Sequence, residues 1–398
     1  MKGRASDAWL QYYRSFDELR RLVYARPYLR ADYAKGAEYL LQEISAAAFN
    51  VSSITRSASP RFNLHLLFEP TTYPWTGPDP NTLYRKAFVD GAGTYRVWGN
   101  RGTSHQLLIQ TIRAYWNDPR PDMKQLGEYD LDDMVKGGTG EFEIIVSPER
   151  HEGNWIKLDP TYDNNCVFVR EAFYDWENEH PAVLHIERID GSRPTYAFGD
   201  DELATKIDGM RRFIEWTIGE YSMTYLEGAE EDGGINTFVK PRMAGHKDAG
   251  INPVTSYFFL IFEIGLDEGL VIEMKDFSTD YWGIQTMNVW NEVNDYLDHQ
   301  SSLNGFQAPP DEDGVVRLVV SARDPGVPNW IDSIGLTKGA MLFRLQKWRS
   351  EPHFETKVVS LDDLRSVLPP STPVVTPDER RASLRTRRAA GLRRYGYA

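Results

Sequence analysis

Apolar positions recur every three or four residues near the start of the chain and again in its middle. This spacing predicts a helix over residues 7–25, a second over 31–48 and a third from about residue 200 to a stop at Gly228. A last helix is expected after Thr376-Pro377-Asp378-Glu379, a capping box with proline at the first helical position. Its apolar stripe is thin, so this helix needs a surface on which to pack.

Between these helices the pattern changes to short runs rich in β-branched and aromatic residues, separated by turns. Such runs are typical of strands. They divide the chain into alternating helical and β segments. The predicted segments are an N-terminal helical segment (1–60), a first β-sandwich (61–198), a linking helix with an acidic loop (199–254), a second β-sandwich (255–365) and a linker with a basic C-terminal helix (366–398).

One stretch of the chain is repeated, with substitutions, about 175 residues further on. GEFEIIVSPERHEGNWIKLDPTYDNNCVFVR begins at Gly140, and GVVRLVVSARDPGVPNWIDSIGLTKGAMLFR begins at Gly314. One inserted residue and one later deletion align them. Two copies of one unit imply two related β domains. We therefore predict a mainly β protein of two tandem jelly-roll-like antiparallel β-sandwich domains, with N-terminal, linking and C-terminal helices.

Both copies contain an Asn-Trp pair, which ends in Trp155 in the first and Trp330 in the second. The structural interpretation is that each indole plugs one end of a sandwich, with its N–H paired, while the preceding Asn binds the backbone of its own turn. The insert Arg-Asp-Pro-Gly-Val-Pro occurs only in the second copy, which makes it the better functional candidate. Its Arg323 and Asp324 can also simply pair across a turn.

Three segments resemble the bacterial family called domain of unknown function 1214, which often accompanies its relative, domain of unknown function 1254. They are GPDPNTLYRKAFVDGAGTYRVWGNRG, DYWGIQTMNVW and EDGVVRLVVSARDPGVPNWIDSIGLTKGAMLFRL. The resemblance covers about residues 70–365, and TPDERRASLRTRR is similar to the family's usual ending. It implies jelly-roll-like sandwiches. It implies no established catalytic residues, so none is carried over.

The charge of the chain is unevenly distributed. The net charge is −13, which argues against nucleic acid as the main partner. Residues 376–398 hold seven arginines against Asp378 and Glu379, so the tail is +5 and the remainder −18. We expect the tail to dock on an acidic surface, either of its own subunit or of a neighbour, and favour a homo-oligomer built through it. RNA binding by the tail is an alternative.

The distribution of apolar residues and cysteine predicts a cytoplasmic location. No apolar run is long enough to span a bilayer, and the charged N-terminus lacks the apolar centre of a secretory signal. The single cysteine, Cys166, excludes an internal disulfide framework. No membrane partner is expected.

Most cofactor motifs are missing from the sequence. No Gly-rich nucleotide loop follows a strand, and no GxSxG elbow occurs. The eight histidines are dispersed, and the nearest approach to a cluster, around His180 and His185, has the wrong spacing for a metal site. We therefore expect neither a metal nor a nucleotide cofactor.

Aromatic residues make up 13% of the chain, and several stand beside acids and amides. This pattern suits core packing, and equally a sugar-like or polar aromatic small molecule. The predicted catalytic residues are Asp280, Asp324 and Asp332 with Arg323 as electrostatic partner; the predicted substrate-binding residues are Tyr281, Trp282, Asn288, Asn291 and Trp330. The predicted function is a metal- and nucleotide-independent hydrolase or lyase that uses carboxylate acid–base chemistry. The alternative is a non-catalytic carbohydrate or small-molecule binding protein.

Overall fold

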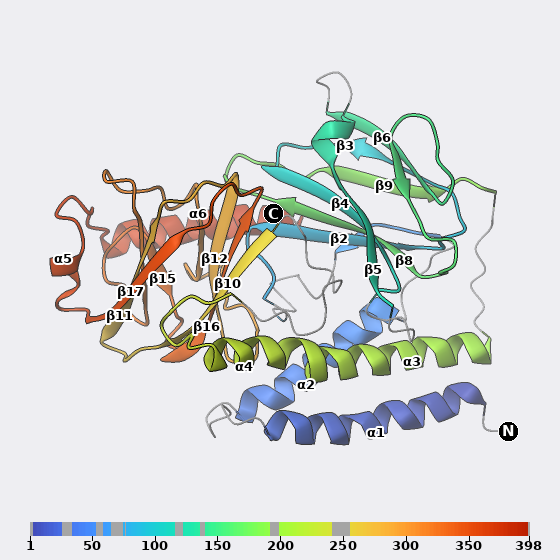
Figure 1. Cartoon of the computed structure of the whole chain (residues 1–398), viewed down its shortest axis with the longest axis horizontal. Coiled ribbons are helices and arrows are strands. Elements are labelled where there is room, and N and C mark those ends of the chain that lie inside the picture. Colours follow the sequence, from blue (N-terminus) through green and yellow to red (C-terminus); the bar gives the residue numbers. More distant parts are fainter. Residues whose placement is uncertain are drawn as a thin grey trace.

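The computed structural model of the protein describes residues 3–25, 34–52, 59–64, 75, 77–115, 122–135, 140–191, 199–240 and 255–396. Residues 241–254, the end of the predicted acidic loop, lie outside this set. The described chain is mainly β, with four sheets above a layer of helices (Figure 1). The mainly β fold predicted from the sequence is thus confirmed.

The first half of the strands forms two sheets around one core. Their strand orders are β1-β2-β8-β4-β5 and β7-β6-β3-β9. Val97 and Ile144 from one sheet share a buried cluster with Ile109 and Val167 from the other. The bounds are β1 (Asn63–Leu64), β2 (Thr82–Val89), β3 (Tyr95–Asn100), β4 (Gln106–Arg113), β5 (Lys124–Asp130), β6 (Glu141–Ser147), β7 (Trp155–Lys157), β8 (Asn165–Ala172) and β9 (Val183–Arg188), with a 3-10 turn η3 (Leu131–Met134) after β5.

The second half of the strands repeats this arrangement. Its sheets have the orders β10-β16-β12-β13 and β15-β14-β11-β17. Leu270 and Leu318 from one sheet meet Phe262 and Phe343 from the other in a buried cluster. The bounds are β10 (Thr255–Glu263), β11 (Glu268–Lys275), β12 (Tyr281–Met287), β13 (Ser302–Asn304), β14 (Val316–Ser321), β15 (Trp330–Asp332), β16 (Lys338–Gln346) and β17 (His353–Ser360).

The repeat in the sequence therefore corresponds to a repeated strand arrangement. The order β2-β8-β4-β5 matches β10-β16-β12-β13 strand for strand. Trp155 stands opposite Ile145 and Trp330 opposite Val319, at the same place in both halves. These two short pairings, β6 with β7 and β14 with β15, are parallel, whereas the other pairings within the sheets are antiparallel. The predicted antiparallel arrangement holds except at these two short strands.

Both Asn-Trp pairs link neighbouring strands through side-chain hydrogen bonds. The Trp155 indole donates to the Ser147 hydroxyl at 3.0 Å, and the Trp330 indole donates to the Ser321 carbonyl at 3.2 Å. The preceding Asn does not bind its own turn. Instead, each Asn side chain donates to a carbonyl of the neighbouring strand, Asn329 to Arg317 for example.

Six α-helices and one π-helical segment are described. Along the lower face in Figure 1 lie α1 (Arg4–Tyr24), α2 (Ala34–Ser52), α3 (Asp200–Trp216) and α4 (Met223–Glu231), with the π-helical segment η4 (Thr217–Ser222) joining the last two. The short α5 (Leu364–Val367) and the tail helix α6 (Pro377–Arg394) follow the second pair of sheets. Helices α1 to α3 cover the outer face of the β2-β8-β4 sheet through one apolar cluster. None of the helices in the described part of the chain has the length and apolarity needed to cross a bilayer.

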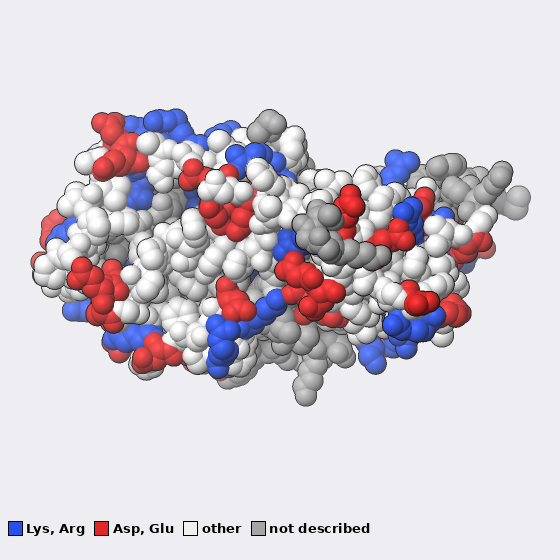
Figure 2. Space-filling model, turned by 90° about the horizontal axis from the view of Figure 1, so that it is seen from above, with Lys and Arg blue, Asp and Glu red and all other residues white. Residues whose placement is uncertain are grey.

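The tail helix α6 packs on its own chain. The predicted capping box is present, because Glu379 N–H donates to the Thr376 hydroxyl and Glu379 accepts from Thr376 N–H. Arg380, Arg387 and Arg394 are buried, and each donates to at least one backbone carbonyl. The sequence predicted docking on acidic residues. Two such contacts are present, Arg380 with Asp324 and Arg388 with Asp298, beside these carbonyl contacts. On the face shown in Figure 2, charges of both signs are interspersed.

The insert in the second repeat receives this helix. Arg380 pairs with Asp324 at 2.9 Å and donates to the Val327 carbonyl at 2.5 Å. Its guanidinium also lies 5.1 Å from the centre of the Trp330 ring. The insert is therefore a docking loop for α6, which explains why the first copy of the repeat lacks it.

A buried polar network joins the first half of the chain to the second. Asp79 accepts from the Tyr281 hydroxyl at 2.5 Å and lies 3.5 Å from Arg344. Arg344 donates to the Gly77 carbonyl and to Gln285. The side chains of Asp79 and Arg344 are only 2% and 5% exposed, so each needs the other's charge.

Arg344→Met should destabilise the protein by about 3–5 kcal/mol, because it leaves the Asp79 carboxylate buried without a cation. Adding Asp79→Asn should restore part of the loss. The matched control is Arg349→Met, which removes an exposed pair with Asp280 and should cost less than about 1 kcal/mol. Urea unfolding measures all three. Equal losses for the two arginine variants would contradict this account of the junction.

Candidate functional site

The structure gives each predicted acid a separate partner. Asp280 pairs with Arg349 at 2.8 Å, and Asp324 pairs with Arg380. Asp332 meets the imidazole of His299. Across the described ranges, no hydrogen bond or ion pair joins any two of these acids. The predicted catalytic arrangement therefore has no support in these contacts.

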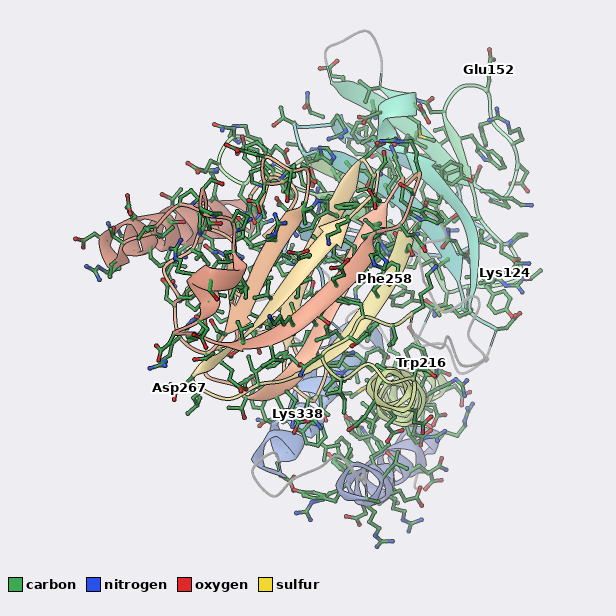
Figure 3. All side chains as sticks on the ribbon, turned by 60° about the vertical axis from the view of Figure 1, so that its left-hand side comes forward. Lys124, Glu152, Trp216, Phe258, Asp267 and Lys338 are labelled. Atoms are coloured by element: carbon green, nitrogen blue, oxygen red, sulfur yellow. The ribbon has the colours of Figure 1, made fainter. Side chains whose placement is uncertain are left out.

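Arg323 pairs with an acid other than the predicted catalytic ones. It forms an exposed ion pair with Asp267, which lies at the outer end of the β10–β11 turn (Figure 3). Asp324 accepts instead from Gly326 N–H and from Arg380. Arg323 and Asp324 are adjacent in sequence but have different partners.

The three predicted aromatic ligands are part of the packing. Tyr281 is 1% exposed and donates to Asp79. Trp282 lies in the second core, with its ring 5.9 Å from that of Phe343. Trp330 is 6% exposed beneath Arg380. The structural interpretation holds for all three.

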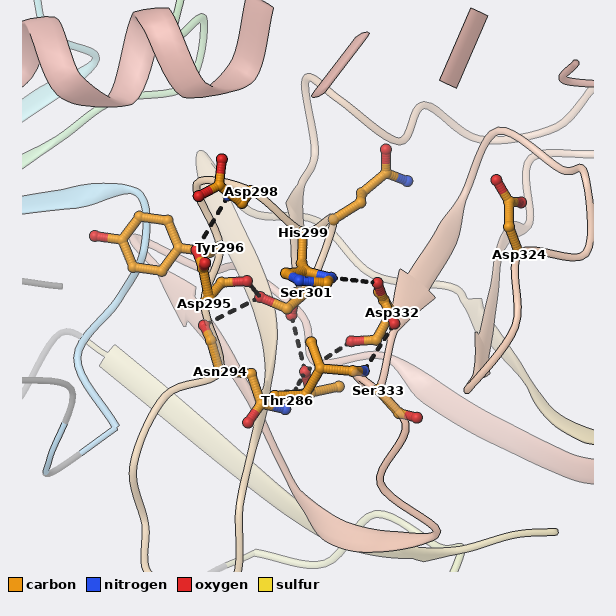
Figure 4. A network of polar contacts seen from close by, with 12 residues as sticks. Thr286, Asn294, Asp295, Tyr296, Asp298, His299, Ser301, Asp324, Asp332 and Ser333 are labelled. Carbon is orange, nitrogen blue, oxygen red and sulfur yellow. Dashed lines mark hydrogen bonds and ion pairs between the residues drawn. The ribbon is translucent and has the colours of Figure 1, made fainter. Parts of the chain in front are cut away.

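His299 and Asp332 form a partly exposed dyad (Figure 4). His299 Nδ1 lies 2.8 Å from Asp332 Oδ2, and Asp332 Oδ1 accepts from Ile334 N–H at 2.7 Å. Asp332 thereby fixes the ring of a histidine whose side chain is 45% exposed. The Ser301 hydroxyl donates to the carbonyls of Asn294 and Asp295, so it is not paired with this imidazole.

A second cluster is built on the turn that carries Asn288 and Asn291. The Asn288 side chain accepts from the N–H groups of Trp290 and Glu292, and donates to the Glu292 carboxyl at 2.5 Å. Asn291 adopts a left-handed φ of 63° and is 3% exposed. Its side-chain oxygen accepts no hydrogen bond from any described donor. These two predicted substrate-binding residues thus lie together, beside an acid that was not predicted.

The acid of the turn, Glu292, faces a glutamate of helix α2. Glu43 accepts from Trp75 N–H at 3.3 Å, and residues 75 and 292 form a β-bridge. The Trp290 ring packs so closely on Gly36 that a Cβ there would come within 2.4 Å of the indole nitrogen. Helix α2 and the turn are therefore in tight contact, with Glu43 4% and Glu292 7% exposed.

The two carboxyl groups are placed close enough to share a proton. Oε2 of Glu43 and Oε1 of Glu292 are buried and find no donor among the other described groups, yet the two side chains are within hydrogen-bonding reach of each other. Two carboxylate anions can only accept, so a hydrogen bond between them requires one to be protonated. Burial, followed by the negative charge of Glu292, raises the pKa of Glu43 to about 9. Burial raises the pKa of Glu292 as well, while its hydrogen bonds from Glu43 and Asn288 oppose this rise.

The same helix contacts a buried amine. Lys86, on β2, is 4% exposed and donates to Asn50 at 3.2 Å. Burial lowers the pKa of Lys86 to about 7 and raises the pKa of the neighbouring Cys166 thiol to about 12. Glu43 and Asn50 are two turns apart on α2, about 10 Å along the axis. An acid pair and an amine whose pKa is lowered by burial therefore lie along one buried helix face.

Sequence reasoning missed Glu43, although a signal was present. Leu40 and Ala47 are buried on α2, and Glu43 stands three residues after the first and four before the second. A glutamate at that spacing lies on the apolar stripe. An acid on such a stripe needs a partner from elsewhere in the fold.

No group of three or more His, Cys, Asp or Glu side chains in the described parts of the chain could hold a metal ion.

The chain is similar to a solved structure of an uncharacterized protein from Burkholderia cenocepacia, at 27% identity and a TM-score of 0.79. The alignment covers 89% of this chain and 97% of that one. A second structure, of the VPA0106 protein from Vibrio parahaemolyticus, has 12% identity and a TM-score of 0.43 over 80% and 98% of the two chains. No family model matches the chain. No curated protein matches it either.

The acid pair should make stability fall as pH rises. The unfolded chain ionises Glu43 near the ordinary pKa of 4.5, whereas the folded chain holds the proton up to about 9. The contribution of Glu43 to the free energy of unfolding is complete below the unfolded pKa of 4.5. It is lost progressively as pH rises toward the folded pKa, by at most about 1.4 kcal/mol per pH unit. Glu43→Gln cannot ionise, so the free energy of unfolding of that variant should fall less between pH 5 and 7.

Glu38→Gln is the matched control for this measurement. Glu38 is an exposed acid of the same helix, paired with Arg20. Urea unfolding of the three proteins at several pH values compares the slopes. If Glu43→Gln and wild type have the same slope, the proton is not shared in the folded state.

Proposed function

We propose that the protein is an enzyme, a hydrolase or lyase, that uses the Glu43–Glu292 pair for general acid–base chemistry. The observation that carries the proposal is the buried pair with one proton, beside two asparagines in a constrained turn. A neutral acid next to an ionised one gives a proton donor and a proton acceptor at the same pH. Buried acids with a raised pKa are concentrated at functional sites.

The roles follow from the charges. Glu43 holds the proton and would donate it to a leaving group. Glu292, whose carboxyl accepts a hydrogen bond from Asn288, would be the ionised partner and accept one. Asn291 offers a buried side-chain oxygen that needs a donor, which a substrate hydroxyl or N–H would supply. The substrate class that fits is a sugar-like or polar aromatic small molecule.

The architecture and setting complete the proposal. We propose two tandem jelly-roll-like sandwiches, supported by the repeated strand order and by one enclosed core for each half. A cytoplasmic location remains part of the proposal, as does a homo-oligomer. Because α6 packs on its own chain, a second subunit would have to use its exposed arginines, such as Arg381 and Arg385.

A thermal-shift screen of metabolites and oligosaccharides, followed by product analysis of each hit, tests this function. On a substrate so found, Glu43→Gln and Glu292→Gln should each lower kcat by about 100-fold or more. Activity of the wild type should fall as pH rises through the pKa of Glu43. The control is Asp280→Asn, which alters only an exposed ion pair and should leave kcat unchanged.

Two outcomes would contradict the proposal. A substrate turned over equally well by wild type and both glutamate variants would place catalysis elsewhere. Ligands that bind and are recovered without chemical change would favour the alternative, a non-catalytic binding protein.

A further inference from the structure

We propose that the groove between α6 and the second sandwich binds a small aromatic carboxylate. The groove has a volume of about 590 Å³, which is in the range of small-molecule sites. Trp176, Leu303, Phe306 and Pro328 line it from the body of the protein, and Ser383 and Arg387 line it from α6. This proposal does not rest on the acid–base function, because the acid pair is not among the residues that line the groove.

Two arginines of α6 form no ion pair within the described chain: Arg387, which lines the groove, and Arg394, which lies against the same Trp176 ring but does not line the groove. Arg387 donates to the Tyr296 carbonyl and the Ser302 hydroxyl, and Arg394 donates to the Pro80 carbonyl. By contrast, Arg380 on the same helix is paired with Asp324. Asp295 is near enough to favour the charged form of Arg387, but it forms no ion pair with it. Two buried positive charges therefore lack a paired carboxylate.

These two charges lie close together around one aromatic ring. The guanidinium carbons of Arg387 and Arg394 are 4.4 and 4.0 Å from the centre of the Trp176 ring. Burial, and then the nearby charge of Arg394, lowers the pKa of Arg387 to about 9. Two nitrogens of Arg394, Nε and Nη1, are buried without an acceptor. An anion beside Arg387 would relieve the repulsion and supply the missing negative charge.

The acids at the rim do not fill this role. Asp175 accepts from the N–H groups of Glu177 and Asn178, and Glu379 is used by the capping box of α6. Both carboxylates are thus committed to turns of the backbone. The third acid that lines the groove, Glu177, is exposed, so water screens its charge. Arg387 uses Nε and Nη2 for its bonds within the protein, which leaves Nη1 to donate to a ligand carboxylate.

The rest of the groove favours an apolar, flat body on that ligand. Phe306 lines the groove and is 56% exposed, which is unusual for so large an apolar side chain. Leu303 and Pro328 add apolar surface, and the Trp176 ring offers a further aromatic contact. An aromatic ring attached to the carboxylate would bury this apolar surface, whereas a compact inorganic anion would leave it exposed to water.

Calorimetric titration of the full chain with benzoate tests the proposal, with acetate as an anion without a ring and benzyl alcohol as a ring without a charge. Benzoate should bind at millimolar concentration and more tightly than either. Arg387→Gln should weaken benzoate binding by at least about tenfold. The matched control is Arg385→Gln, an exposed arginine of the same helix that does not line the groove.

Since Arg387 also anchors α6, a second variant keeps the test independent of folding. Ser383→Trp adds a ring from an exposed position on the helix into the groove and should abolish benzoate binding with α6 still docked. Unchanged binding in Ser383→Trp, equal weakening by the two arginine variants, or equal affinity for acetate and benzoate would overturn the proposal. Glu43→Gln should bind benzoate as the wild type does, so this result is separable from that of the acid–base function.

Discussion

Polar groups enclosed between the two sandwiches must find their partners inside the protein, and the rest of the structure depends on this constraint. Asp79 is 2% exposed, so its carboxylate needs the charge of Arg344 and the hydroxyl of Tyr281. Those partners come from the second pair of sheets, while Asp79 lies between β1 and β2 of the first. Satisfying one buried acid therefore fixes how the two halves of the chain meet.

The same requirement positions the candidate site. The segment from Met287 to Leu297 is held at one end by helix α2, through Trp290 on Gly36 and Glu292 against Glu43. At its other end α6 holds it, because Arg387 donates to the Tyr296 carbonyl. A segment restrained on both sides can keep two carboxyl groups together that would separate if it moved. The acid pair is thus a consequence of how helices and sheets are joined.

The sequence predicted the parts of this structure that depend on local pattern. Helix spacing, the capping box at Thr376 and the repeat that begins at Gly140 and Gly314 are each encoded within a few residues, and they match the elements observed. The predicted helix stop at Gly228 is wrong, because α4 continues to Glu231. The site itself depends on contacts between distant residues. Glu43 and Glu292 are brought together by tertiary packing, which no spacing along the chain reveals. The predicted acids Asp280, Asp324 and Asp332 were abundant residue types at plausible places, and each is instead paired with its own cation or imidazole.

The central claim is that Glu43 remains a neutral acid in the folded protein at neutral pH. Infrared difference spectra between wild type and Glu43→Gln, recorded across a pH titration, measure this directly through the carbonyl stretch of a protonated carboxyl group. The wild type should show this band at pH 7 and lose it only as pH rises toward 9, and the variant should lack it. A band that is already lost near pH 5 would show that both glutamates are ionised and that no neutral Glu43 exists at neutral pH.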